Sequence, residues 1–151
     1  MIVFRLSNNI YANDLTGKGA EIYGGRWNSV GTPMIYTAES RALCAVEIAV
    51  NTPLSNIPTG FSLITFQIPE AVISLVEESI LPANWNALPY SPFTISLGDL
   101  FIAEQKSLIL KVPSAIIAGD FNFLINPLHA DIGKVKIISV EDFRFDGRLF
   151  R

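Results

Sequence analysis

The sequence contains few charged residues for its length. Asp, Glu, Lys and Arg make up 17% of its 151 residues, and 50% of the residues are hydrophobic, whereas soluble domains carry about 25% charged residues. A disordered chain needs high net charge and few apolar residues, so this composition excludes disorder. At this length we expect one domain, residues 1–151, that is long enough to bury a core of its own.

The sequence also lacks a long apolar run. The longest unbroken one covers residues 42–46, and a membrane-spanning helix needs about 20 nearly continuous apolar residues. Two longer stretches without charge, 48–69 and 79–97, are interrupted by Pro, Asn and Ser. We therefore expect no membrane span, and we expect the apolar excess to be buried in a core, in a partner interface or in both.

Cysteine and histidine occur once each, as Cys44 and His129. A single cysteine excludes an intramolecular disulfide and a multi-cysteine zinc site, and a single histidine excludes a His-rich metal site. Cys44 is expected to pack as a small buried hydrophobe. The first residues do not show a basic segment followed by an apolar stretch, so we expect no signal peptide and a cytoplasmic location.

There is no excess of basic residues. The 11 Lys and Arg are scattered along the chain against 14 Asp and Glu, which gives a net charge of −3 and a pI of about 5.1. Nucleic-acid-binding proteins usually show a basic patch or stripe. We therefore expect no direct contact with DNA or RNA.

Short apolar runs rich in β-forming residues recur along the chain. They predict strands at 2–6, 34–37, 61–68, 107–112, 121–125 and 134–140, with a further strand at 71–76. Between the strands, irregular loops are predicted, such as the proline-rich segment 82–92 around Trp85.

Only two segments predict a helix. Residues 39–50 place Leu43, Val46 and Val50 on one apolar stripe. Residues 96–105 predict a shorter helix, with Ser96 as its N-cap and Asp99 at the capping-box position. Strands outnumber helices and do not alternate with them, so the predicted fold is α+β with mostly antiparallel sheets.

Residues 8–28 are rich in Gly, Asn and Thr and are predicted to form a long loop, which in a compact domain is usually functional or disordered. Neither G-x-x-x-x-G-K-[ST] nor a G-x-G-x-x-G between a strand and a helix occurs there, which excludes the usual glycine-rich phosphate motifs. The simpler interpretation is that Gly17-Lys18-Gly19 and Gly24-Gly25 mark turns that need a positive φ.

Two charged residues stand out against this sparse background. Arg26 follows two glycines, and a guanidinium beside closely approaching backbone suits an anionic ligand; an exposed arginine with its stem packed on Trp27 is the more common arrangement. Glu47 lies four residues after Leu43, on or beside the apolar face of the predicted helix. Such a glutamate is a buried, paired residue, an active-site carboxylate with a perturbed pKa, or a helix-edge residue in water, and the residues alone leave these alternatives open.

Ser114 and His129 give weaker signals. Ser114 follows Pro113 without a G-x-S-x-G elbow, so a hydrolase nucleophile is not expected, and a turn hydroxyl is the simpler interpretation. A Ser–His–Asp triad could use only His129, and nothing in the sequence places it beside Ser114.

The order and spacing of these segments resemble the RES domain family, which is named after an Arg, a Glu and a Ser. The matching segments are Gly24-Gly25-Arg26-Trp27-Asn28, Gly31-Thr32-Pro33, Ile35-Tyr36-Thr37-Ala38, Ala42-Leu43 with Glu47, Val112-Pro113-Ser114-Ala115, Asn122-Phe123-Leu124-Ile125-Asn126-Pro127 and Phe143-Arg144-Phe145-Asp146-x-Arg148-Leu149. The resemblance covers essentially the whole chain. One departure is Gly147, where the family often has Pro.

This resemblance implies a compact fold related to the ADP-ribosyltransferases and an enzyme that consumes NAD as its substrate, with no metal and no further cofactor. The family supplies toxins of Xre–RES toxin–antitoxin pairs. These toxins break the nicotinamide–ribose bond by hydrolysis or phosphorolysis, or transfer ADP-ribose to a protein side chain, and NAD depletion arrests growth. The implied partner is an Xre-type helix-turn-helix antitoxin that blocks the NAD pocket in a hetero-oligomer and alone contacts DNA.

The resemblance assigns catalysis to Glu47, Arg26 and Tyr36, and substrate binding to Arg26, Tyr36, Ser114, Trp27 and Asn126. Nicotinamide leaves as a neutral base, so positive charge develops on the ribose, where a fixed carboxylate at Glu47 would stabilise it. Arg26 would hold a phosphate, and Tyr36 would stack on nicotinamide. Ser114 would hydrogen-bond the nicotinamide or the ribose.

In the same assignment, Trp27 would form a wall of the site, and Asn126 would orient it. Two alternatives stay open at this point: a mono-ADP-ribosyltransferase that modifies a specific protein, and an inactive RES domain that only binds a partner. The presence of Arg26, Tyr36, Glu47 and Ser114 argues against the inactive domain.

Overall fold

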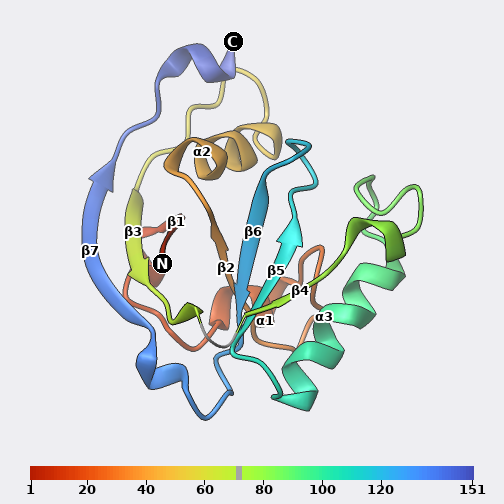
Figure 1. Ribbon diagram of the computed structural model, residues 1–151. Helices are drawn as coiled ribbons and strands as arrows, with labels where there is room; N and C mark the ends of the chain where they lie inside the picture. Colours follow the sequence, from red (N-terminus) through yellow and green to blue (C-terminus); the bar gives the residue numbers. More distant parts are fainter. Residues whose placement is uncertain (71–72) are drawn as a thin grey trace.

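One mixed β-sheet forms the centre of the molecule in the computed structural model, which describes residues 1–70 and 73–151. In this part of the chain, seven strands are arranged in the order β4-β5-β6-β2-β1-β3-β7 (Figure 1). The strands are β1 (Ile2–Asn8), β2 (Ile35–Ala38), β3 (Phe61–Gln67), β4 (Ile73–Leu75), β5 (Ile109–Pro113), β6 (Phe121–Ile125) and β7 (Lys136–Phe143). The described α-helices are α1 (Lys18–Tyr23), α2 (Arg41–Val50) and α3 (Pro92–Glu104).

Neighbouring strands pair antiparallel, except that β4 runs parallel to β5. The register of β2 on β6 places Tyr36 opposite Leu124 and Ala38 opposite Asn122. Directly opposed residues of antiparallel strands point to the same face of a sheet. The side chains of Tyr36 and Asn122, which are far apart in sequence, therefore share one face.

Apolar residues cover both faces of this sheet. On one face, Phe123 and Ile125 of β6 belong to a cluster with residues such as Val3 and Ile35. On the opposite face there are two clusters. One joins Phe101 and Ile102 of α3 with the two tryptophans and with residues of β5 and β6.

The second cluster on that face joins Leu43 and Cys44 of α2 with Phe4, Ala38 and the C-terminal aromatic residues. Helices α2 and α3 therefore cover the same face at two separate places, and Figure 1 shows them well apart. The middle of this face, over β2, is left for the functional groups described below.

The predicted α+β class and the predominance of antiparallel pairing are confirmed. The predicted strands are all present, with ends that differ by at most three residues, and the strand at 121–125 has the predicted ends. For the strand predicted at 71–76, the structure has β4 at Ile73–Leu75, and residues 71–72 lie outside the described residues.

The prediction of a loop over 8–28 is wrong in part, because a 3-10 helix at Asn9–Tyr11 and helix α1 lie within it. The predicted start of the second helix is also wrong. Ser91 caps α3 by accepting a hydrogen bond from the Phe93 N–H, and Pro92 stands at the first position, where proline is favoured. Ser96 is interior to the helix.

None of the helices in the described ranges is long and apolar enough to cross a bilayer.

Candidate active site

Two adjoining cavities open on the face of the sheet over β2. The first, of about 500 Å³, is lined by β1, β2, the segment around α1 and part of α2. The second, of about 540 Å³, is lined by residues 24–27, by the loop around Tyr90 and by the end of α2. Both cavities share Gly19, Ala20, Tyr36 and Glu47. We call them the first and the second lobe of one cleft, whose lobes meet at Tyr36 and Glu47 and have the volumes typical of small-molecule sites.

Glu47 reaches this junction from α2. Ser40 starts the helix by accepting a hydrogen bond from the Leu43 N–H at 3.0 Å, and Leu43 and Cys44 bury its apolar side. The Asn122 amide donates to Oε1 of Glu47 at 2.8 Å. Burial raises the pKa of Glu47 to about 7, while the hydrogen bond from Asn122 acts to lower it. The carboxylate therefore changes charge near neutral pH.

Tyr36 is fixed by two hydrogen bonds through its hydroxyl. The hydroxyl donates to Oδ1 of Asn28 at 2.6 Å and accepts from the Trp27 backbone N–H at 3.0 Å. Burial is the main cause that raises the pKa of Tyr36, so the phenol is neutral. The ring itself lines both lobes.

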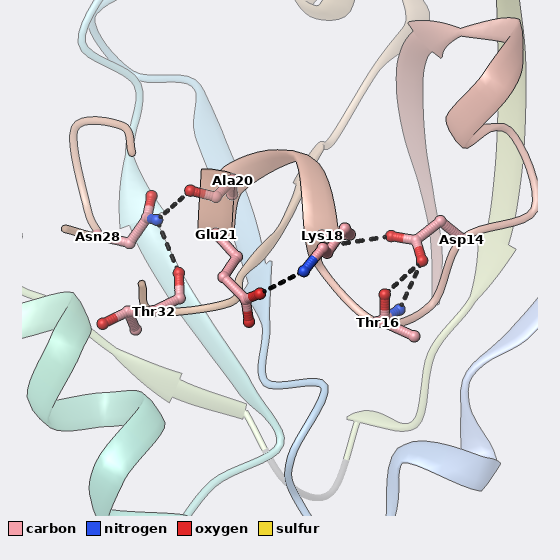
Figure 2. Close-up of polar contacts among 7 residues, drawn as sticks. All are labelled: Asp14, Thr16, Lys18, Ala20, Glu21, Asn28 and Thr32. Atoms are coloured by element: carbon pink, nitrogen blue, oxygen red, sulfur yellow. Dashed lines mark hydrogen bonds and ion pairs between the residues drawn. The ribbon is translucent and has the colours of Figure 1, made fainter. Parts of the chain in front are cut away.

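Asn28 joins the loop after α1 to the rest of the site. It is 1% exposed, and its amide donates to the carbonyl oxygens of Ala20 at 2.8 Å and Thr32 at 2.9 Å (Figure 2). On the far side of α1, the Asp14 carboxylate accepts from the backbone N–H groups of Thr16 and Lys18 (Figure 2). These contacts hold α1 and the following loop as one unit.

The two glycines before Arg26 have different roles. Gly24 has φ +70° and Gly17 has φ +71°. Both therefore adopt the positive φ that the turn interpretation predicts. Gly25 has no positive φ; instead, a Cβ there would lie 2.7 Å from the Tyr36 hydroxyl oxygen. Gly25 therefore lets the tyrosine approach the backbone of the loop.

Arg26 is anchored by one of its two terminal nitrogens. Nη1 donates to the carbonyl oxygens of Trp85 at 2.9 Å and Ala87 at 3.0 Å, and the guanidinium lies 5.0 Å from the Tyr90 ring centroid. Burial lowers the pKa of Arg26, but a guanidinium in a protein stays charged. The described residues supply no partner for the Nε and Nη2 hydrogens, so three donors of this residue, which lines the second lobe, remain unused by the protein.

Trp27 is held between the loop and α3. It is 3% exposed, and its ring centroid lies 6.0 Å from that of Trp85. A Cβ on Gly98 of α3 would lie 1.6 Å from the Trp27 carbonyl oxygen, so only glycine fits there. The Asp99 carboxylate accepts from the Ser29 N–H at 2.9 Å and from the Ser29 hydroxyl at 2.6 Å. Asp99 therefore binds the loop after Trp27 and does not form the predicted capping box.

The structure brings four of the six predicted site residues together: Arg26, Trp27, Tyr36 and Glu47 all line the second lobe. Ser114 is not among the described residues that line either lobe. Its Oγ accepts from the N–H groups of Ile116 and Ile117, both at 3.1 Å, and thereby supports the turn that brings Ile116 to the second lobe. Its predicted contact with a substrate stays a prediction.

Asn126 likewise lies away from the lining of both lobes as the described residues define it. Its amide donates to the carbonyl oxygens of Phe101 at 3.4 Å and Ile102 at 3.2 Å, and its Oδ1 accepts from the Leu128 N–H at 2.9 Å. Asn126 therefore ties the end of α3 to the end of β6. Its predicted orienting role stays a prediction.

Cys44 is buried, as predicted; its thiol donates to the Phe4 carbonyl oxygen at 3.4 Å, and burial raises its pKa to about 12. His129 accepts a hydrogen bond from the Asp131 N–H in a turn. Within residues 1–70 and 73–151, no three His, Cys, Asp or Glu side chains gather as a metal site would require.

Several residues that line the cleft were not among the predicted site residues, and Asn122, Tyr90 and Arg5 are three of them. Asn122 and Tyr90 line the second lobe. Arg5 lines the first lobe, where its Nη2 donates to the carbonyl oxygens of Tyr11 at 2.9 Å and Asp14 at 3.2 Å. Only Asn122 gave a usable signal, because a lone amide in an apolar strand requires a hydrogen-bond partner when buried.

Comparison with known proteins adds to this geometry. Residues 2–146 match the model of a family described as RES domain. A protein named Prs ADP-ribosylating toxin, from Sphingobium sp. (strain YBL2), is 37% identical over 93% of this chain and 89% of its own length. A protein named Toxin Res, from Photorhabdus laumondii, is 35% identical over 100% of this chain and 98% of its own.

The fold is also similar to a solved structure. A chain in the crystal structure of the M. tuberculosis MbcT-MbcA toxin-antitoxin complex superposes with a TM-score of 0.75. The match covers 99% of this chain and 86% of that one, at 19% sequence identity. At this identity the similarity concerns the fold.

Proposed function

The chain belongs to the RES domain family, and from this premise we propose that it is the toxin of a toxin–antitoxin pair that cleaves the nicotinamide–ribose bond of NAD. The observation that carries the proposal is the placing of Arg26 and Glu47 in one lobe of the cleft, with Glu47 at the junction to the other lobe. The names of the Sphingobium and Photorhabdus relatives support the toxin role.

The charge of Glu47 suits the chemistry of this cleavage. The bond from ribose C1′ to the pyridinium nitrogen breaks, and both of its electrons go to nicotinamide, which leaves as a neutral base. Positive charge develops on the ribose, and a carboxylate fixed on a helix stabilises that charge without moving. Such a role needs the ionised form of Glu47, so activity should rise as pH increases through about 7.

Arg26 suits a phosphate of the dinucleotide. Three of its donors have no partner among the described residues, and hydrogen bonds from a charged donor to phosphate are among the strong ones. The guanidinium of Arg5 is already bonded to the carbonyl oxygens of Tyr11, Ala12 and Asp14 and lies 5.2 Å from the Phe66 ring centroid, on the sheet face that Val3 shares. We therefore assign phosphate binding to Arg26.

Tyr36 and Trp27 are proposed to shape the site around the nicotinamide ribose. The Tyr36 ring lines both lobes at the junction and can offer its face to the leaving group. Its hydroxyl is already used in two hydrogen bonds, so we propose a packing role for the ring and no proton transfer. The reaction as proposed uses no metal and no cofactor beyond NAD as the substrate.

After the bond breaks, an acceptor oxygen attacks C1′ and loses its proton. With water as the acceptor the product is ADP-ribose, and with phosphate it is ADP-ribose 1-phosphate. With a protein hydroxyl the product is an ADP-ribosylated protein. A second candidate function is therefore mono-ADP-ribosylation of a specific protein, and the name of the Sphingobium relative favours it. The two functions share the cleft and differ only in the acceptor.

We further propose that an antitoxin of the Xre type binds this chain and covers the cleft. The support is the similar fold of a chain in a toxin–antitoxin complex. Such a pair would act in the cytoplasm, where NAD is used, and contact with DNA would come through the antitoxin.

The acceptor can be found with purified protein. Wild type incubated with NAD should release nicotinamide in buffer alone, or faster with added phosphate, and mass spectrometry should identify ADP-ribose or its 1-phosphate. If nicotinamide is released only when cell extract is present and a protein gains one ADP-ribose, the second candidate is correct.

Expression of wild type should lower cellular NAD and stop growth, whereas Glu47→Ala and Arg26→Ala should be tolerated at equal protein levels. Normal growth and normal NAD in cells that express folded wild type would contradict the toxin role.

A further inference from the structure

We propose that Asn122 is a positioning residue of this site, which aims the Glu47 carboxylate at the junction of the two lobes and holds it in the charged form. Its effect on turnover rests on the proposed function. Its effect on the ionisation of Glu47 can be measured without turnover.

The position of Asn122 is fixed by the sheet. It lies on β6, which is paired on both sides, with Ala38 of β2 and Val112 of β5 as its neighbours in register. An inner strand of this kind is hydrogen-bonded to a neighbouring strand on both sides, so the backbone that carries the Asn122 side chain is rigid. Glu47 comes from α2, a separate element, and the contact between the two residues spans 75 positions in sequence.

The orientation of the amide is also determined. Nδ2 donates to Oε1 of Glu47 at 2.8 Å and to the Thr37 carbonyl oxygen at 3.2 Å. Because both partners are oxygen acceptors, only the NH₂ end of the amide satisfies them. The bond to the Thr37 carbonyl oxygen fixes the orientation of the Asn122 side chain, so the bond to Glu47 holds the carboxylate at a defined place in the cleft.

The surroundings of Glu47 make this donor necessary. Its neighbours along α2 are Val46 and Ile48, and burial disfavours the charge. No ion pair to Glu47 occurs among the described residues. Among the described residues, the hydrogen bond from Asn122 is the contact that favours the charged form of Glu47.

Other titratable groups face the same cleft. The first lobe also holds Arg5, Tyr11, Asp14, Tyr23 and Cys44. The second also holds Arg26 and Tyr90, and Tyr36 lies in both. Of these, Cys44 is the one whose pKa is raised in part by the charge of Glu47, and its thiol is neutral in the working range. None of them replaces the donor that Asn122 supplies.

Two substitutions remove that donor in different ways. Asn122→Leu keeps a similar volume without hydrogen bonds, and Asn122→Asp keeps the shape but places a second carboxylate beside Glu47. Ser62→Ala serves as the control, because Ser62 is buried and its hydroxyl donates to Oδ1 of Asn9 at 2.6 Å outside both lobes. It measures the effect of losing a buried hydrogen bond elsewhere on the sheet.

The first readout is the titration of Glu47 itself, followed by carbon-detected NMR of the glutamate carboxyls, with Glu47→Gln to assign the signal. Losing one hydrogen bond to a charged group should raise the Glu47 midpoint by about one pH unit in Asn122→Leu and by more in Asn122→Asp. Ser62→Ala should leave it in place. An unchanged midpoint in folded Asn122→Leu overturns the proposal, whether or not NAD is cleaved.

The second readout is the pH profile of nicotinamide release. In Asn122→Leu the rising limb should move to higher pH together with the NMR midpoint. A shift of about one unit lowers the ionised fraction of Glu47 at pH 7 about fivefold, so kcat should fall by that factor and recover most of the loss by about pH 9. A loss of stability alone would move neither the rising limb of the pH profile nor the NMR midpoint. If the NMR midpoint shifts while wild type releases no nicotinamide, the role of Asn122 stands and the proposed function fails.

Discussion

Replacing Glu47 with glutamine should stabilise the protein while removing its activity. Glutamine keeps the size of the side chain and an oxygen that can accept from Asn122, but it carries no charge. The folded protein buries the Glu47 carboxylate, and its pKa of about 7 is well above the ordinary value of about 4.3. The wild-type protein therefore loses free energy of folding whenever this group is ionised.

The pH range follows from the direction of the shift. Between pH of about 4.3 and about 7 the folded state binds more protons at Glu47 than the unfolded state, so the free energy of unfolding falls as pH rises through this range. Each pKa unit corresponds to about 1.4 kcal/mol, which gives a loss of at most about 4 kcal/mol above pH 7. Glu47→Gln lacks this loss.

Urea unfolding at two pH values measures the effect. At pH 8, the free energy of unfolding of Glu47→Gln should exceed that of wild type by up to about 4 kcal/mol, and at pH 4.5 the two values should be nearly equal. Glu141→Gln is a matched control, because Glu141 is exposed on β7 and its replacement should change both values little. If Glu47→Gln is no more stable than wild type at pH 8, burial does not disfavour the charged form of the Glu47 carboxylate.

Three further substitutions test the parts around Glu47. Arg26→Met should weaken the binding of ADP-ribose, measured by calorimetry, about tenfold or more, and unchanged affinity would remove Arg26 from the phosphate site. Gly98→Ala should destabilise the fold by about 3 kcal/mol or more, since the new Cβ would meet the Trp27 carbonyl oxygen at 1.6 Å, whereas Gly133→Ala, with nothing within 4 Å, should be near neutral in thermal unfolding. Ser114→Ala should cost about 1 kcal/mol from its lost turn hydrogen bonds; a raised KM for NAD would add the predicted substrate contact, and an unchanged KM would leave the turn as its function.

Local patterns predicted the elements that carry strong periodicity. The apolar stripe of Leu43 and Val46 gave α2 to within two residues at its start. Helix α1 was missed because it has six residues and depends on tertiary contacts such as the bond from Asn28 to the Ala20 carbonyl. The start of α3 was misplaced because Ser96 and Asp99 imitate a capping box, while Ser91 and Pro92 carry the true start signal.

The site could be predicted only in part. Arg26, Tyr36 and Glu47 lie close in sequence on consecutive elements, and their spacing carried the resemblance to the family. Asn122 meets Glu47 only because β6 pairs with β2, and no local pattern encodes that pairing. Tyr90 belongs to an irregular loop, whose position depends on the bonds that its neighbours make with Arg26.

The central proposal is that a carboxylate at Glu47 promotes loss of nicotinamide from NAD. The most direct measurement is single-turnover release of nicotinamide, followed by chromatography, with wild type and Glu47→Gln each in excess over NAD at pH 8. Wild type should convert NAD to nicotinamide in step with NAD loss, and folded Glu47→Gln should be at least about a hundredfold slower. Intact NAD with wild type, or equal rates for the two proteins, would contradict the account.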